Sequence, residues 1–168
     1  LVHHTQLIAE LLAQGRIRVD ASLQRVVFHD PCYLGRHNGE FDAPRQVLQS
    51  LCRDAPLEMA LSREKAMCCG AGGGRMWMEE TIGKRINITR VEQALALQPQ
   101  TIATACPYCA VMVGDGLGAL QPQATTQSRD IAELVRLHLA DLGCEVHLAD
   151  DGAAGLARAQ AQAFDLVI

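Results

Sequence analysis

The stretch Thr101–Cys109, TIATACPYC, places a pair of cysteines directly after a predicted strand. Residues 101–105 are apolar and β-branched, which is typical of a short buried strand, and Cys106 follows its end. An earlier stretch, RVVFH at 25–29, has the same order, because Asp30-Pro31 ends the apolar run and Cys32 comes next. Two cysteine groups are therefore predicted to follow the ends of two strands.

Helical patterns lie before and between these strands, where apolar residues recur at helical spacing. The expected helices cover residues 2–14, ending at Gly15; 43–51, capped by Asp42; and 79–97, with Ile82, Ile86 and Leu95 on one face. Strands that alternate with helices predict an α/β fold with short parallel strands and crossover helices. In such folds, loops at the C-terminal ends of strands gather at one edge and build sites there.

A third cysteine group lies in Lys65–Trp77, KAMCCGAGGGRMW. The Cα atoms of adjacent residues are about 3.8 Å apart, too close for the usual disulfide, so Cys68 and Cys69 need separate partners or one shared partner. The three groups are separated by 35 and 36 residues, each enough for a strand-helix crossover. This spacing favours convergence of five thiols: Cys32, Cys68, Cys69, Cys106 and Cys109.

Composition limits the classes of protein to which the chain can belong. Its 168 residues are 49% apolar and 4% aromatic, so we expect a sizeable core of small aliphatic side chains. A net charge of −4 without a Lys/Arg stripe excludes nucleic acid as a partner. No apolar run of about 18 residues or charged leader is present, so we expect a soluble chain. Because the chain begins inside a predicted helix, we expect it to be a piece of a longer polypeptide.

The cysteine count points to a metal centre and not to disulfides. Seven cysteines are an odd number, which argues against a complete disulfide framework. Cys52 and Cys144 stand alone in apolar stretches and are interpreted as buried small hydrophobic residues. The other five are candidate metal ligands.

Two kinds of metal centre suit this pattern, and a third interpretation needs no metal. Zinc is well served by C-x-x-C pairs, whereas an iron-sulfur cluster is larger and gains from backbone N–H groups near its sulfurs. The bare loop after Cys69 favours the cluster, and we interpret Gly70, Gly72 and Gly73 as cofactor-binding. The loop lacks the spacing of a phosphate-binding P-loop. A dithiol redox pair, Cys106 with Cys109, would leave the other three cysteines unexplained.

Cys32, the sequence CCG at 68–70 and the C-x-x-C pair resemble the cysteine-rich CCG domain of heterodisulfide reductases and of the iron-sulfur subunits of glycolate oxidases. The resemblance covers roughly residues 1–130 and includes HDPC, CCGAGGGRMW, GKRIN and ATACPYC. It implies a redox domain of an iron-sulfur oxidoreductase that holds a 4Fe-4S cluster, either cubane or, as in heterodisulfide reductase, noncubane. In both cases the candidate ligands are Cys32, Cys68, Cys69, Cys106 and Cys109. His29 is a further candidate, either to tune the cluster or to form a turn.

The resemblance also implies partners and a location. Family members usually carry a ferredoxin-like domain and a second CCG domain, so these are expected in the longer polypeptide. A flavin-dependent dehydrogenase or another redox subunit is the expected electron partner. The expected location is cytoplasmic, at the inner face of a membrane where partners anchor the complex. Electron transfer is our first expectation, ahead of substrate reduction at an open iron.

Residues 131–168 follow a different pattern, which resembles part of a response-regulator receiver domain. The pattern consists of a helix end, a strand EVHLA at 145–149, a turn and helix in DDGAAGLARAQ, and a strand DLVI at 165–168. The acidic pair and the phospho-accepting Asp of receivers are missing. We therefore predict two domains, 1–130 and 131–168, and interpret their meeting point as a junction of two fragments.

Overall fold

The computed structural model describes residues 2–121, 123, 125–141, 143–149 and 151–164, and its centre is a three-stranded parallel sheet. The strands are β1 (Val26–Phe28), β2 (Thr101–Thr104) and β3 (Gln127–Asp130), in the order β1-β2-β3. Val26 lies opposite Thr101, and Thr101 lies opposite Gln127. The predicted α/β fold with parallel strands is confirmed.

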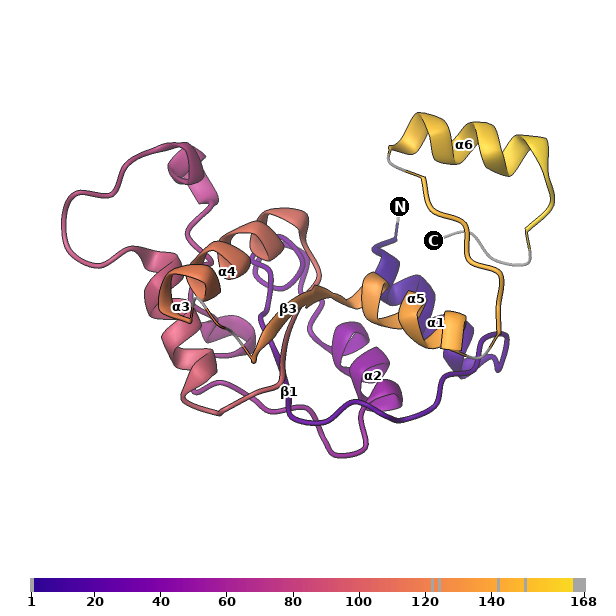
Figure 1. Cartoon of the computed structure of the whole chain (residues 1–168), viewed down its shortest axis with the longest axis horizontal. Helices are drawn as coiled ribbons and strands as arrows, with labels where there is room; N and C mark the ends of the chain where they lie inside the picture. The colour runs from indigo at the N-terminus through magenta and orange to yellow at the C-terminus, as the bar shows by residue number, and fades with distance from the viewer. Residues whose placement is uncertain (1, 122, 124, 142, 150, 165–168) are drawn as a thin grey trace.

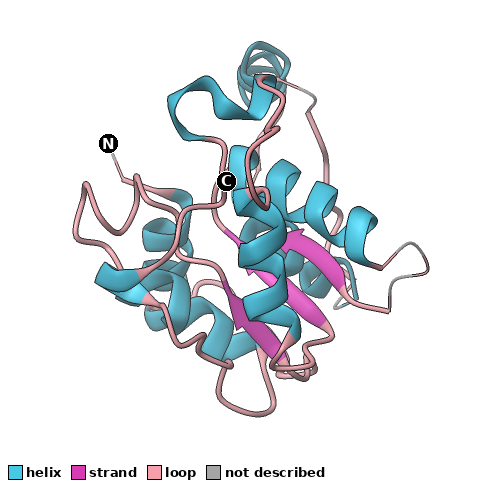
Figure 2. Ribbon diagram, turned by 90° about the vertical axis from the view of Figure 1, so that its left-hand side faces the viewer, coloured by secondary structure: helices cyan, strands magenta, loops and turns pink. Residues whose placement is uncertain are grey.

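Helices cover both faces of the sheet (Figures 1 and 2). On one face lie α1 (His4–Ala13), α2 (Asp42–Leu51) and α5 (Ile131–Asp141), which share a core with Val26 and Phe28. On the other face lie α3 (Ile86–Leu95) and α4 (Pro107–Leu120), which pack on Val27 and Ile102. Successive side chains of a strand point to opposite faces, so the short apolar strand β1 is buried on both.

The first two predicted helices form, with one correction to a cap. Helix α1 ends as expected, and Gly15 follows its C-cap with a positive φ of 66°. Helix α2 begins at Asp42 itself, and the cap comes from Glu40 instead. One carboxylate oxygen of Glu40 accepts hydrogen bonds from the backbone N–H of Asp42 at 3.0 Å and of Ala43 at 2.8 Å.

The third predicted helix was too long at its N-terminal end. Helix α3 begins at Ile86, and residues 79–85 form a loop in which Gly83 has a φ of 71°. The Glu80 carboxylate accepts a hydrogen bond from the Ile86 N–H at 3.2 Å, which gives α3 its start. Ile82, expected on the packed face, is 93% exposed because it lies in this loop.

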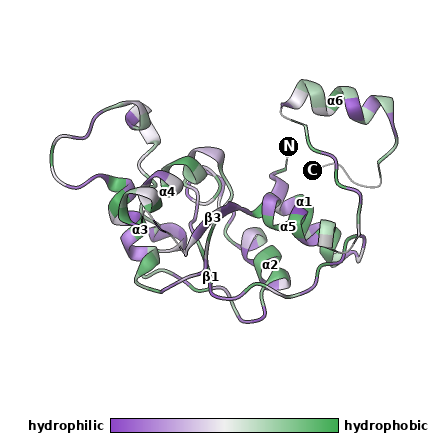
Figure 3. Ribbon diagram, in the orientation of Figure 1, coloured by the Kyte–Doolittle hydropathy of each residue, from purple (hydrophilic) through white to green (hydrophobic). Residues whose placement is uncertain are grey.

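Strand β3 was not predicted, because its sequence QSRD is hydrophilic and carries no strand signal (Figure 3). It forms because its backbone pairs with β2, and as the edge strand it leaves one side free for polar residues. Helix α5 follows it directly and buries Ile131, Leu134 and Val135 against α1 and α2. The domain boundary at residue 130 stays a prediction.

The tail after α5 differs in part from the receiver-like pattern. Residues 144–149 form no strand among those described, so the expected strand EVHLA is wrong, and the fourth segment, DLVI, lies outside the described residues. Helix α6 (Gly152–Ala161) forms as expected, and the Asp151 carboxylate accepts from the Ala154 N–H at 2.7 Å. Figure 1 shows α6 apart from the layered body.

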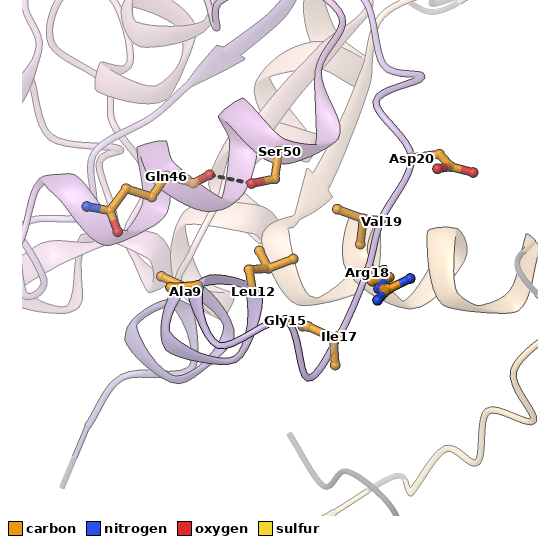
Figure 4. Close-up of a pocket in the computed structure, with 10 residues that line it drawn as sticks. Ala9, Leu12, Gly15, Ile17, Arg18, Val19, Asp20, Gln46 and Ser50 are labelled. Carbon is orange, nitrogen blue, oxygen red and sulfur yellow. Dashed lines mark hydrogen bonds between the residues drawn. The ribbon is translucent and has the colours of Figure 1, made fainter.

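An open hollow of about 600 Å³ lies between α1, α2 and the segment at residues 15–20 (Figure 4). Its floor is apolar, with Leu12 and Ile17, and Arg18, Asp20, Gln46 and Ser50 stand at its rim. No cysteine lines it, so the hollow is separate from the candidate metal centre. None of the helices in the described part of the chain has the length and apolar character needed to cross a membrane.

Candidate metal centre

Cys32 is carried to the C-terminal edge of the sheet by the loop after β1. The loop is fixed at Asp30, whose side chain is 3% exposed. The two Asp30 oxygens accept from the Arg45 guanidinium at 2.7 and 3.0 Å, and one also accepts from the Arg63 backbone N–H at 2.9 Å. This buried ion pair holds the turn, and Cys32, two residues later, is half-buried.

Cys106 and Cys109 reach the same edge from β2. Cys106 is the N-cap of α4, and Pro107 occupies its first turn, where a missing N–H has no cost. Cys109, one turn into the helix, is 2% exposed. Because β1 and β2 are parallel, the loops after both strands open on one edge and bring Cys32 beside the C-x-x-C pair.

Cys68 and Cys69 lie in a long loop between two short 3-10 helices, η1 (Arg63–Lys65) and η2 (Gly72–Trp77), with no described strand directly before them. The Cys109 thiol donates a hydrogen bond to Cys69 Sγ at 3.4 Å. The Gly70 N–H donates to Cys68 Sγ at 3.3 Å. The two adjacent cysteines therefore use different partners within one centre.

Four of the five thiols pack together. Cys69 and Cys109 are buried with Met112, and Cys68, Cys106 and Met76 pack against them. Burial raises the pKa of Cys32, and Cys68, Cys69 and Cys106 raise it further, as expected for a thiol near this cluster.

The pKa values diverge within this group. Hydrogen bonding from Cys109 lowers the pKa of Cys69 to about 4, assisted by His29 and by the Ala71 N–H and opposed by burial. Interaction with Cys109 likewise lowers the pKa of Cys106 to about 6, assisted by backbone N–H groups at the start of α4. The pKa of Cys109 is raised, because it donates to both neighbours. The site stabilises thiolates, the form that binds metals.

His29 lies inside the centre and is 1% exposed. Its ligand nitrogen and the sulfurs of Cys69 and Cys109 all lie within 4.8 Å of one another. Its Nδ1 accepts a hydrogen bond from Arg90 Nε at 2.9 Å. Burial lowers the pKa of His29, so the ring is held neutral.

Arg90 is the residue that sequence reasoning missed. It is 1% exposed, on the face of α3 that also buries Asn87, Val91 and Ala94. A charged residue at helical spacing with apolar neighbours was the available signal. Lys84 and Arg85, which lie on the same side of the motif in sequence, instead pair with Glu92 and Asp115 at the surface.

The glycines of the loop at residues 70–74 differ in their distance from the thiols. Gly70 is buried with a φ of 98°, and its Cα packs against the start of α3, where a Cβ would lie 3.2 Å from the Asn87 backbone nitrogen. A Cβ on Gly72 would lie 4.0 Å from Cys68 Sγ. Gly73 and Gly74 have positive φ and face open space. Gly70 and Gly72 therefore lie at the centre, and Gly73 lies on its outer side.

The two remaining cysteines lie outside the group. Cys52 is buried at the end of α2, as predicted. Cys144 is exposed, so its interpretation as a buried hydrophobic residue was wrong, since residues 144–149 do not form the strand that would have covered it.

The donor set fits a soft, thiolate-bound metal or cluster. Thiolate ligands select zinc, Cu(I) and iron-sulfur clusters, and the described part of the centre contains no carboxylate ligand. Backbone N–H groups of Gly70 and Ala71 point to sulfur, as cluster sites require. The buried cation of Arg90 also suits a centre that carries negative charge.

Comparison with known proteins defines the class. The CCG family model, described as "Cysteine-rich domain", matches residues 26–114. This chain belongs to that family of cysteine-rich domains, as the resemblance in its sequence predicted.

Several relatives of the chain are named as oxidoreductases or reductases. The chain is 48% identical over 134 residues to "Probable iron-sulfur-binding oxidoreductase FadF" of Bacillus subtilis. It is 40% identical over 141 residues to the EtfAB:quinone oxidoreductase of Syntrophomonas wolfei, and 36% identical over 136 residues to one chain of the dihydromethanophenazine:CoB--CoM heterodisulfide reductase of Methanosarcina barkeri. These matches cover 79%, 79% and 80% of this chain but only 19%, 20% and 33% of the relatives. No solved structure matches the chain.

Proposed function

We propose that this chain is an electron-transfer module that binds one 4Fe-4S-type cluster for a flavin- or quinone-linked oxidoreductase. The observation that carries the proposal is the packing of four cysteines, Cys68, Cys69, Cys106 and Cys109, at the edge of the sheet where Cys32 follows β1. Zinc and a cubane cluster would each take four of these thiolates, so the number of cysteines does not distinguish them. Two relatives whose names specify iron-sulfur proteins support the cluster over zinc.

The proposed ligands come from three segments and have different environments. Cys69 and Cys106 are held ready as thiolates, whereas Cys109 must lose the proton that it shares with both. Cluster assembly therefore releases a proton from Cys109. Cys32, Cys68 and Cys106 are half-buried, whereas Cys69 and Cys109 are buried.

When bound, the cluster would accept one electron and pass it on. The residues of this chain contribute ligation, exclusion of water by Met76 and Met112, and hydrogen bonds to sulfur. No side chain needs to perform acid-base chemistry for this role. Simple electron transfer accounts for these features, and the hollow shown in Figure 4, whose lining contains no cysteine, is not part of this proposal.

The names of the relatives suggest which proteins exchange electrons with this domain. The names of two relatives specify a quinone oxidoreductase and a heterodisulfide reductase, so we propose that a flavin-dependent dehydrogenase or similar redox subunit exchanges electrons with this domain. Because the chain spans a fifth to a third of the relatives, further domains would supply the rest of the electron path.

Metal analysis with a cysteine series tests the function. Protein prepared without oxygen should be brown and contain iron and acid-labile sulfide; a colourless zinc protein would refute the proposal. Single Cys→Ser variants at positions 32, 68, 69, 106 and 109 should lower the iron content. One dispensable cysteine supports a cubane cluster, which needs four thiolates and which we favour. Five indispensable cysteines support a noncubane cluster, and two or more dispensable ones contradict a shared centre.

A further inference from the structure

We propose that Arg90 is a positioning residue that holds His29 as a hydrogen-bond donor to the Cys69 sulfur, and that this pair raises the reduction potential of the cluster. The inference has two halves. The redox half, the effect on the potential, deepens the proposed function and rests on it. The geometric half, the hydrogen bonds of Arg90 and His29, concerns the chain without metal.

Arg90 is a buried cation whose hydrogen bonds have a specific direction. Its Nε donates to His29 Nδ1, and its Nη1 donates to the Leu61 carbonyl and to Gln93 Oε1, each at 2.9 Å. Nη2 is buried without a hydrogen-bond partner. A buried charge that lacks a partner costs several kcal/mol by order of magnitude, so a protein retains one only where it is compensated.

The compensation for Arg90 does not come from a contacting carboxylate. Among the described residues, none lies within salt-bridge distance of it, and Asp30 is already bound by Arg45. The negative groups that favour the charged guanidinium at longer range are Asp30, Cys109 and Cys69. Arg90 donates to His29, whose ligand nitrogen lies within 4.8 Å of the sulfurs of Cys69 and Cys109, so its charge stands next to the metal centre.

The bond from Arg90 decides which nitrogen of His29 carries the proton. A guanidinium has only donors, so Nδ1 must present its lone pair, and the single proton of the neutral ring lies on Nε2. Cys69 is the thiolate of the pair that it forms with Cys109, so it is an acceptor. The ligand nitrogen of His29 lies within 4.8 Å of Cys69 Sγ, so Nε2–H is the donor that the ring can offer to this sulfur.

The Nε2–H donor of His29 should affect the reduction potential of the cluster. Hydrogen bonds to the sulfurs of an iron-sulfur cluster are among the features that set its potential, because they stabilise the more negative, reduced state. Cys69 is already reached by the Ala71 N–H, and His29 adds a side-chain donor that the sequence can change. Removal of the donor should therefore shift the potential to more negative values.

The first test uses the chain without metal. Nitrogen-15 NMR of the imidazole distinguishes the two neutral tautomers and the imidazolium. We expect His29 as the Nε2–H tautomer. An Nδ1–H tautomer or an imidazolium would overturn the inference whether or not the chain binds iron.

The second test measures the midpoint potential of anaerobically reconstituted protein by redox titration followed by electron paramagnetic resonance. His29→Leu should keep its iron and shift the potential negatively, and His29→Gln, whose amide can donate from a similar position, should restore part of the shift. Arg90→Met should shift the potential in the native background and much less in the His29→Leu background. Equal shifts of Arg90→Met in both backgrounds would show that its charge acts alone and would overturn the positioning role.

The two proposals fail in different ways. A native chain that takes up no iron refutes the proposed function, and the tautomer then decides the geometric half of the inference. If Arg90→Met does not fold, the comparison of His29→Leu with His29→Gln still decides the redox half. An unchanged potential in a fully loaded His29→Leu protein overturns that half alone.

Discussion

Replacement of Gly70 by alanine tests whether the bend after the adjacent cysteines is required. Gly70 has a φ of 98°, a conformation that costs an L-residue about 1–2 kcal/mol. Its new Cβ would lie 3.2 Å from the Asn87 nitrogen and 3.3 Å from both Ile86 Cβ and Met112 Cε. Overpacking of this kind costs about 1–3 kcal/mol, so the variant should lose about 2–5 kcal/mol of unfolding free energy in total.

Gly73→Ala is the matched control for this variant. Gly73 also has a positive φ, 65°, but nothing lies within 4 Å of its new Cβ, so only the backbone cost of about 1–2 kcal/mol applies. The gain from a stiffer unfolded chain is the same in both variants and cancels in the comparison. Urea unfolding of the metal-free chains, followed by far-ultraviolet circular dichroism, measures the difference.

The expected result is a lower urea midpoint and less bound iron for Gly70→Ala than for Gly73→Ala. The iron content should fall because a shift at Gly70 moves Cys68 and Cys69, which precede it, whereas Gly73 lies on the outer side of the loop. Equal midpoints for the two variants, or full iron content in Gly70→Ala, would refute the account of this loop.

Three further perturbations extend the tests. Gly116→Ala should be less stable than Gly114→Ala by about 1–3 kcal/mol in urea unfolding, because its Cβ would lie 2.8 Å from Val91 Cγ2 whereas Gly114 is open; equal stability would contradict the close packing of α3 on α4. Burial raises the pKa of Cys52 from 9.0 to about 11, so its neutral thiol stabilises the fold below pH 9 and this contribution is lost as the pH rises toward 11. Cys52→Ala should keep its iron and lose less stability between pH 9 and 11 than the native chain; iron loss would show that the cysteines were sorted wrongly. Deletion of residues 144–168 should leave the iron content unchanged, since no proposed ligand lies there, and a loss on analysis would make the tail part of the centre.

The parts of the fold that could be predicted are those with local signals. β1 and β2 are apolar runs that end at polar or cysteine residues, and α1 ends at a glycine with positive φ. β3 could not be predicted, because QSRD has no strand propensity and forms a strand only through pairing with β2. The N-terminal part of the third expected helix was predicted wrongly. Gly83 and Glu80 make the helix begin at Ile86, and the periodicity of apolar residues carries no signal for such a start.

The candidate site likewise contains residues that the sequence could predict and one that it could not. Cys32, Cys106 and Cys109 could be assigned to one edge, because parallel strands place their C-terminal loops together. Cys68 and Cys69 follow no described strand, and only their spacing from the other cysteines indicated that they join this group. Arg90 could not be assigned, since it comes from the middle of α3 and its partner His29 is 61 residues away in sequence. Such contacts depend on how the helix rotates against the sheet, and only the folded chain shows that.

The pairing of β1 with β2 has a consequence for folding kinetics. Val26 and Thr101 are neighbours in the sheet, but the chain between them contains α2 and α3, so this contact closes a long loop and is entropically costly. The unit β2-α4-β3 is local, and we expect it to form early, with β1 joining late. β1 leads directly to His29 and Cys32. Newly made chains would thus pass through a period in which Cys106 and Cys109 are in place without Cys32, and in air that period is when these thiols would be most vulnerable to oxidation.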